Sequence, residues 1–181
     1  LKELSDGTIF TDSTGITLSG TRFLTVCILF KNLFKKRINS NNIGLLLPTS
    51  SAGAFINYMV LLMGKTAVNL NFTAPIDSLK LSIKKANIKT IISSKKFVEK
   101  LESRGIKISN IFFDAEVFYL EDERNNISKV KSVLVYLNVK FLPLFLLKIL
   151  YLKKTKKDAT SIILFSSGSE GIPKGIELTG D

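Results

Sequence analysis

The chain has 181 residues, about the size of one domain, with 45% hydrophobic and 23% charged residues. These proportions are those of a globular protein, so we expect a folded domain with a core of its own. The sequence contains no histidine, which excludes Ser-His-Asp and Cys-His nucleophilic machinery and histidine-based zinc sites. Chemistry in this chain must therefore rest on hydroxyl groups, carboxylates, lysines and backbone amides.

The net charge of the chain is +11 at pH 7. Such a balance is typical of proteins that meet nucleic acid, an anionic membrane surface, nucleotide phosphates or an acidic protein. The alternative is that the lysines are scattered over solvated faces, and most of them are scattered along the sequence. No zinc-finger spacing, basic heptad region or Arg-Gly-aromatic pattern is present, so we predict no nucleic-acid partner. The single cysteine, Cys27, lies in an apolar helical pattern and is predicted to pack in a core, in a reducing, cytoplasmic compartment.

Strand and helix signals alternate along the chain. Residues 8–11 and 16–18 flank a turn with Gly15 and predict a hairpin, after which Ser19 begins a helix with apolar residues at helical spacing. Further helices are predicted from Ser50 or Ser51, from Pro75 and over 95–104. Short apolar runs predict strands at 43–47, 66–70, 90–93, 110–113 and 162–165. This alternation predicts an α/β fold with a mostly parallel sheet and flanking helices. The polar residues 121–126 are predicted to form an exposed loop.

Residues 132–152 form an apolar stretch that contains Lys140 and Lys148 near its middle. In a helix that spans a bilayer, these two lysines would lie near the centre of the bilayer, where charged side chains are costly, so we predict no spanning helix here. An amphipathic helix that begins at Pro143, with the lysine-rich segment after it, instead predicts peripheral contact with a membrane through residues 132–157, at the inner face of the cytoplasmic membrane. The alternative is a helix that packs on its own domain and ends in a solvated lysine tail.

The segment FSSGSEGIPKGIELT, residues 165–179, follows the last predicted strand. Its glycines allow backbone amides to turn toward an anion, its serines add hydroxyl donors and Lys174 adds a mobile positive charge. It is not the P-loop of NTPases, because Pro173 precedes the lysine and Gly175 follows it. The glycine spacing also differs from the dinucleotide-binding fingerprint. A loop that holds phosphates is therefore predicted, and the alternative is a plain glycine-serine turn between two strands.

Residues 165–175 resemble the signature loop of the AMP-forming adenylating enzymes, which include acyl-CoA synthetases, luciferases and peptide-synthetase adenylation domains. The combination SGSEG followed by PKG is similar to the acyl-acyl-carrier-protein synthetase module of bifunctional 2-acylglycerophosphoethanolamine acyltransferases. Residues 42–101 resemble the same module, and the likeness extends over residues 8–179. Where the family usually has threonine in the loop, this chain has Glu170.

The resemblance implies a ligase of phospholipid and fatty-acid recycling. Such a ligase activates a fatty acid with ATP and Mg²⁺ to an acyl-adenylate, then transfers the acyl group to the thiol of acyl carrier protein or CoA. The residues that would surround the β- and γ-phosphates are Ser166, Ser167, Gly168, Ser169, Gly171 and Lys174. Glu170 would repel the phosphates unless it helps to hold Mg²⁺ or points away. The resemblance places no catalytic residue and no metal ligand in this chain.

The resemblance also implies that residues 1–181 form a single incomplete domain, the N-terminal portion of an AMP-binding domain that ends just after the phosphate-binding loop at 165–175. We expect the chain alone to be inactive, because the family's adenine-binding residues and catalytic lysine follow this loop. An unpaired edge at residues 162–165 would favour self-association. The alternative function is a non-catalytic α/β module that binds an anion or a membrane surface.

Overall fold

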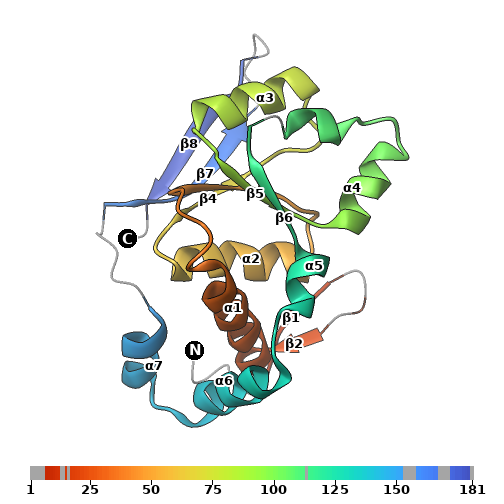
Figure 1. Cartoon of the computed structure of the whole chain (residues 1–181). Coiled ribbons are helices and arrows are strands. Elements are labelled where there is room, and N and C mark those ends of the chain that lie inside the picture. Colours follow the sequence, from red (N-terminus) through yellow and green to blue (C-terminus); the bar gives the residue numbers. More distant parts are fainter. Residues whose placement is uncertain are drawn as a thin grey trace.

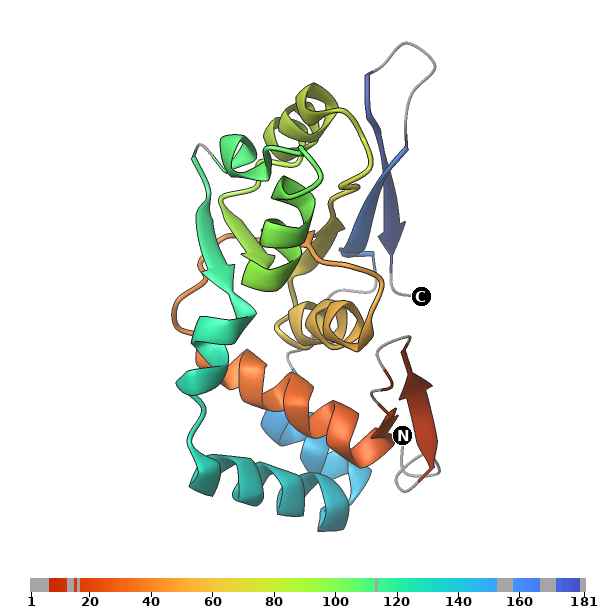
Figure 2. The same cartoon turned by 90° about the vertical axis from the view of Figure 1, so that its right-hand side faces the viewer.

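A computed structural model describes residues 7–12, 15, 17–112, 114–152, 158–166 and 172–179. Its centre is a six-stranded sheet with helices on both faces (Figure 1). A separate two-stranded hairpin, β1 (Thr8–Thr11) with β2 (Thr17–Ser19), lies beside the N-terminal end of the first helix (Figure 2). The predicted α/β fold with a mostly parallel sheet is confirmed.

The strand order of the sheet is β6-β5-β3-β4-β7-β8. Neighbours from β6 to β7 run parallel, and β8 runs antiparallel to β7. In this order the strands are Glu116–Tyr119, Thr90–Ser93, Asn42–Leu46, Thr66–Asn69, Thr160–Ser166 and Lys174–Thr179. Because the first five are parallel, their carboxyl ends share one edge of the sheet, where ligands bind in open α/β sheets.

Two hydrophobic cores lie against the two faces of the sheet. Helices α1 (Gly20–Phe34) and α2 (Ser51–Leu62) cover one face, and α3 (Ile76–Lys85) and α4 (Lys95–Glu102) cover the other (Figures 1 and 2). The first core includes Phe34, which is fully buried, and the second includes Ile91. The prediction that Cys27 packs in a core is confirmed, and burial raises the pKa of its thiol to about 12.

The predicted helix starts at the serines are also confirmed. The Ser19 hydroxyl accepts from the Arg22 amide at 3.4 Å and caps α1. Of the two candidates for α2, Ser50 is the N-cap, since its hydroxyl accepts from the Gly53 amide at 3.3 Å. A side-chain oxygen at this position satisfies an amide that has no partner within the helix, which explains why the helices begin where they do.

The strand predicted at 110–113 is wrong. Residues Ile108–Ile111 form a 3-10 turn, and the strand that follows is β6 (Glu116–Tyr119). The turn places Ile108 and Ile111 on one side, where both are buried in the second core. A short apolar run indicates burial, but by itself it does not distinguish a strand from a helical turn.

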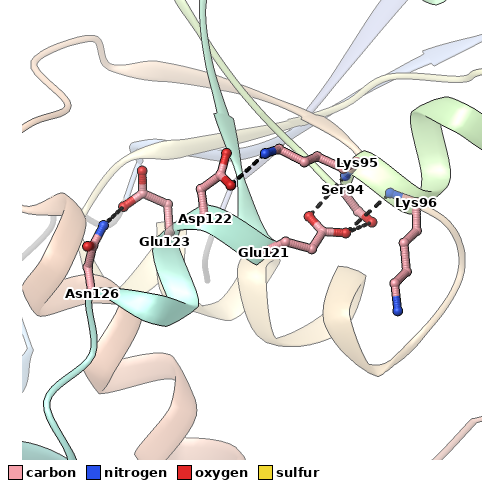
Figure 3. A network of polar contacts seen from close by, with 7 residues as sticks. All are labelled: Ser94, Lys95, Lys96, Glu121, Asp122, Glu123 and Asn126. Atoms are coloured by element: carbon pink, nitrogen blue, oxygen red, sulfur yellow. Dashed lines mark hydrogen bonds and ion pairs between the residues drawn. The ribbon is translucent and has the colours of Figure 1, made fainter.

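The loop predicted at 121–126 is a helix, α5 (Leu120–Asn125). Its first turn carries Glu121, Asp122 and Glu123, and negative charge at this end is favoured by the helix dipole. The side chains do not all point to solvent (Figure 3). Glu121 reaches across to the start of α4, where it accepts from the Ser94 hydroxyl at 2.7 Å and from the Lys95 amide at 2.9 Å.

These contacts predict a pH-dependent contribution of Glu121 to stability. Burial alone would raise the pKa of its carboxyl, but the hydrogen bonds from Ser94 and from the amides of Lys95 and Lys96 outweigh burial, so the pKa lies below its usual value. The carboxylate therefore stabilises the fold above the pKa of the unfolded chain, and this contribution is lost as the pH falls through the lower, folded pKa. We expect Glu121→Gln to lower the free energy of unfolding by about 1 kcal/mol at neutral pH, the typical value of a helix cap.

Urea denaturation from neutral to acidic pH measures this difference, which should shrink as the carboxyl becomes protonated. Asp122→Asn is the control, because Asp122 pairs with Lys95 on the exposed surface and should contribute less. A loss in Glu121→Gln that stays constant with pH would contradict the assignment.

The unpaired edge predicted at residues 162–165 is not found. Strand β7 pairs with β4 on one side and with β8 on the other, so residues 162–165 have sheet neighbours on both sides. The free edge lies on β8 instead, where every residue is exposed, including Ile176 and Leu178. Strand β7 itself is less buried than an internal strand of a parallel sheet usually is, because only Ile163 is buried. Self-association through this end of the sheet stays a prediction, now located on β8.

Two helices follow α5 at the end of the molecule away from the β7–β8 hairpin: α6 (Lys129–Phe141) and α7 (Leu144–Tyr151) (Figure 1). The helix start at Pro143 is confirmed, since this proline is the N-cap of α7. Over the described part of the chain, every helix is too short or too polar to cross a membrane. The lysine-rich residues 153–157 lie outside the described residues.

Candidate functional site

The structure places two of the predicted phosphate-binding residues and brings them together. Ser166 ends β7, Lys174 begins β8, and the two are paired in the register of the hairpin. The Ser166 hydroxyl donates to the Lys174 carbonyl at 3.5 Å, and both residues are exposed. The other residues of the prediction lie outside the described residues: Ser167, Gly168, Ser169, Glu170 and Gly171. Ser166 and Lys174 thus lie side by side, at the ends of the two strands that flank the signature loop.

Gly175 has a packing role that the sequence did not predict. It pairs with Phe165 across the hairpin, and a Cβ at this position would lie 3.3 Å from Cε1 of Phe165. The phenylalanine ring lies close to the glycine and packs against the second core. The absence of a side chain at residue 175 therefore makes room for the ring, whereas the glycines of the loop were predicted to let backbone amides turn toward an anion.

A hollow of about 270 Å³ lies beside the hairpin, at the carboxyl ends of β4 and β7. Its polar lining includes Asn71, Thr73, Ser78 and Ser166. The Asn71 carboxamide oxygen accepts from the Thr73 amide at 3.0 Å and from the Thr73 hydroxyl at 2.6 Å, which shapes the connection between β4 and α3 as an Asx turn. Sequence reasoning missed these residues, although the polar segment after the strand was a signal for them.

Helix α3 is tied to the hairpin by a long-range contact. The ammonium of Lys85, in the last turn of α3, donates to the Pro173 carbonyl at 3.0 Å. Lys85 and the exposed Lys174 put two positive charges next to the signature loop. Hydroxyl donors, ammonium groups and a hollow partly lined by polar side chains, at the carboxyl edge of a sheet, suit a phosphate-bearing ligand. Among the described residues, no group of three or more acidic or cysteine side chains could hold a metal ion.

A larger cleft, of about 700 Å³, lies on the other side of the end of β4. Its walls come from the β1–β2 hairpin, the start of α2 and the segment after β4. The Asp12 carboxylate accepts from the Ser51 amide at 2.9 Å and from the Ser51 hydroxyl at 2.7 Å. Because this carboxylate already occupies the positive end of α2, the cleft does not offer that helix terminus to an anionic ligand.

Asn57 and Asn69 line the inner wall of this cleft and bind each other. Each side-chain amide donates to the other side-chain oxygen, at 3.1 and 2.9 Å. The pair joins α2 to the end of β4. Sequence reasoning did not predict this cleft, because its residues come from three separate segments of the chain.

Gly53 sets how closely α2 approaches the segment that connects it to β3, at this cleft. A Cβ on residue 53 would lie 2.7 Å from the Pro48 carbonyl oxygen, which is backbone and cannot rotate away. We therefore expect Gly53→Ala to lower the free energy of unfolding by about 2 kcal/mol, the usual cost of forcing an extra methyl group into a packed site. Chemical denaturation measures the change. Gly7→Ala is the control, because a Cβ there meets no atom within 4 Å. Equal stability of both variants would contradict the close approach.

Solved structures share this arrangement of strands and helices. The O-succinylbenzoate coenzyme A synthetase from Bacillus subtilis, in complex with AMP, is 14% identical, with a TM-score of 0.67, over 98% of this chain and 40% of that one. The amide bond synthetase McbA from Marinactinospora thermotolerans is 15% identical, with a TM-score of 0.69, over 99% of this chain and 33% of that one. At this identity the likeness shows the fold, and this chain spans less than half the length of either structure.

The sequence profile of the AMP-binding enzyme family matches residues 37–181. This match covers most of the chain, including the whole six-stranded sheet and the hairpin with Ser166 and Lys174. The chain belongs to the AMP-binding enzyme family.

Proposed function

We propose that this chain supplies the phosphate-binding part of a ligase that activates a fatty acid with ATP. The observation that carries the proposal is the pairing of Ser166 with Lys174 at the loop end of the β7–β8 hairpin, in a chain of the AMP-binding enzyme family. In this proposal the fatty-acid carboxylate attacks the α-phosphorus of ATP and pyrophosphate leaves, which gives an acyl-adenylate. A thiol of acyl carrier protein or CoA then takes the acyl group, and AMP leaves.

The described residues would act on the departing pyrophosphate. The Lys174 ammonium and the Ser166 hydroxyl would donate to the β- and γ-phosphates and stabilise negative charge as it develops there. Lys85 would hold the stem of the hairpin through Pro173, 3.0 Å away, so that the two donors keep their places. The remaining loop residues, Ser167, Gly168, Ser169 and Gly171, are proposed donors by resemblance. Glu170 would either help to hold Mg²⁺, which would supply further positive charge to the phosphates, or point away from them.

Pyrophosphate release by the complete ligase, with ATP and a panel of acids, tests the reaction. We expect release that depends on a fatty acid, with no stimulation by amino acids or aromatic acids. The matched control is each acid without ATP. Release driven only by a non-fatty acid would overturn the proposed substrate while leaving adenylation intact. No exchange of pyrophosphate with any acid would overturn adenylation itself.

The dependence of turnover on salt concentration tests the proposed acceptor. Acyl carrier proteins are acidic, and a chain with a net charge of +11 should meet them faster at low ionic strength. Turnover with carrier protein should therefore fall much more steeply with salt than turnover with a small thiol such as pantetheine. Equal salt dependence for the two acceptors would contradict an electrostatic encounter with carrier protein.

A further inference from the structure

Helix α6 has its apolar stripe turned to solvent. Val130, Val133, Leu134, Leu137 and Phe141 recur at helical spacing and are between 42% and 70% exposed. The same helix buries only one residue, Val135, and it packs on α1 through this opposite side. An amphipathic helix normally turns its apolar stripe toward the core. Helix α6 therefore exposes an apolar stripe in addition to the side that packs on α1, and an exposed apolar surface of this kind marks a contact site.

Helix α7, which follows α6 directly along the chain, also exposes apolar residues. It exposes Phe145, Ile149 and Leu150 by 57% to 73%, and it buries only Leu147. We call the exposed apolar residues of both helices the α6–α7 surface. Both views place helices α6 and α7 at one end of the molecule, with the β7–β8 hairpin at the other end (Figures 1 and 2). A contact made by this surface would therefore leave the hairpin with Ser166 and Lys174 accessible.

The charged side chains of α6 and α7 themselves are all positive. Residues 129–152 contain four lysines and no acidic residue, and all four lysines are exposed. Lys131 and Lys140 lie about a quarter turn to either side of the α6 stripe, given about 100° per residue. Lysines in these places can lay their carbon chains along the apolar surface and hold their ammonium groups at its rim. A second copy of the same surface would bring like charges together, so the charge disfavours self-pairing.

A basic hollow of about 500 Å³ opens at the edge of the surface, where α7 meets the end of α1. Lys31, Lys35 and Lys65 line it together with Ile149 and Leu150 of α7. Burial, and then the neighbouring charge of Lys35, lower the pKa of the Lys31 ammonium. An anionic group in this hollow would offset the crowding of positive charge, while an attached hydrocarbon chain would meet the isoleucine and leucine.

We propose that the α6–α7 surface docks on the surface of a bilayer that contains anionic lipids. The outward apolar stripe would enter the boundary between headgroups and acyl chains, the flanking lysines would contact the anionic headgroups, and the basic hollow would take one of those headgroups. The two helices have 13 and 8 residues, which fits helices that lie on a membrane and do not cross it. The proposal does not depend on the proposed catalytic function.

The first arm of the test measures flotation of the full chain with vesicles of phosphatidylcholine, alone or with about 30 mol% phosphatidylglycerol, the anionic lipid that the lysines would contact. The wild-type chain should float with the anionic vesicles at low salt and be released at high salt. Lys131→Gln with Lys140→Gln should lower the partition coefficient about twenty-fivefold, since each lysine near such a surface contributes about fivefold. The control variant, Lys84→Gln with Lys100→Gln, has the same net charge change on exposed positions of α3 and α4 and should float like the wild type.

The second arm tests the apolar stripe. Phe141→Ser with Ile149→Ser should lose flotation at any salt concentration, whereas Leu81→Ser, at an exposed leucine of α3, should not. Circular dichroism checks that each variant is folded, and the lysine pair carries the test if the serine pair does not fold. The proposal is overturned if both lysine pairs float equally, or if neutral vesicles bind as well as anionic ones. It is also overturned if light scattering shows a dimer that Phe141→Ser dissociates, since a second copy would then cover the surface.

Discussion

Lys174→Ala should slow pyrophosphate exchange by the complete ligase about tenfold to a hundredfold, the value of one charge-assisted contact to a phosphate. Lys174 is exposed and pairs with Ser166 at the loop end of the β7–β8 hairpin. Its ammonium can therefore reach a ligand that binds beside the loop. If the contact strengthens as pyrophosphate departs, most of the loss should appear in kcat, with a smaller change in KM for ATP.

Two further variants make this result specific. Lys100→Ala removes the same charge from an exposed position of α4, on the helix that follows β5, and should leave exchange unchanged. Lys174→Arg keeps the charge and should restore part of the rate. Unchanged exchange in Lys174→Ala would remove the hairpin from the mechanism. A similar loss in Lys100→Ala would assign the effect to overall charge.

Arg37→Met should lower the free energy of unfolding by about 3 kcal/mol, because it leaves a buried carboxylate without its cationic partner. Glu123 is 5% exposed, and its Oε2 lies 2.5 Å from Nη1 of Arg37. The guanidinium also lies over the Phe118 ring, 4.6 Å from its centroid. After the substitution, the carboxylate keeps a hydrogen bond from the Asn126 side chain, at 3.5 Å. The pair joins the end of α1 to α5, so its loss should also loosen that junction.

Urea denaturation at neutral pH measures the loss in Arg37→Met. Arg124→Met is the matched control, since Arg124 is an exposed arginine of α5, and it should change the free energy of unfolding by less than about 0.5 kcal/mol. Adding Glu123→Gln to Arg37→Met should recover part of the stability, because the buried charge is then removed. A double variant that is no more stable than Arg37→Met would show that the arginine acts through its packing on Phe118 alone.

Local signals in the sequence were sufficient for most elements of the sheet and its helices. Serines at helix starts, proline before α7 and short apolar runs each act on their own neighbourhood, and Ser19, Ser50 and Pro143 begin helices as predicted. The same signals failed where one pattern suits two structures. Ile108 and Ile111 are buried in a 3-10 turn, and the acidic residues after β6 begin a helix.

The candidate site was also only partly predictable from the sequence. The glycines, serines and Lys174 of the signature loop were enough to predict a phosphate-binding loop. The sequence did not show that Ser166 pairs with Lys174, or that Lys85 binds the Pro173 carbonyl from 88 residues away in the chain. The cleft beside α2 was also missed, because Asp12 reaches its partner across 39 residues. Contacts of this length depend on the register and order of strands, which local patterns do not specify.

The sequence by itself thus determined the fold class, the loop that resembles a phosphate-binding motif, and the presence of apolar and basic residues between 129 and 152. Only the tertiary structure decided that β8 covers the edge of β7, that Glu121 binds the start of α4, that Glu123 is buried beside Arg37, and that the apolar stripe of α6 faces solvent. The physical reason is that periodicity shows which residues share one side of a helix or strand, whereas the packing of distant segments decides whether that side meets a core, a neighbouring strand or the solvent.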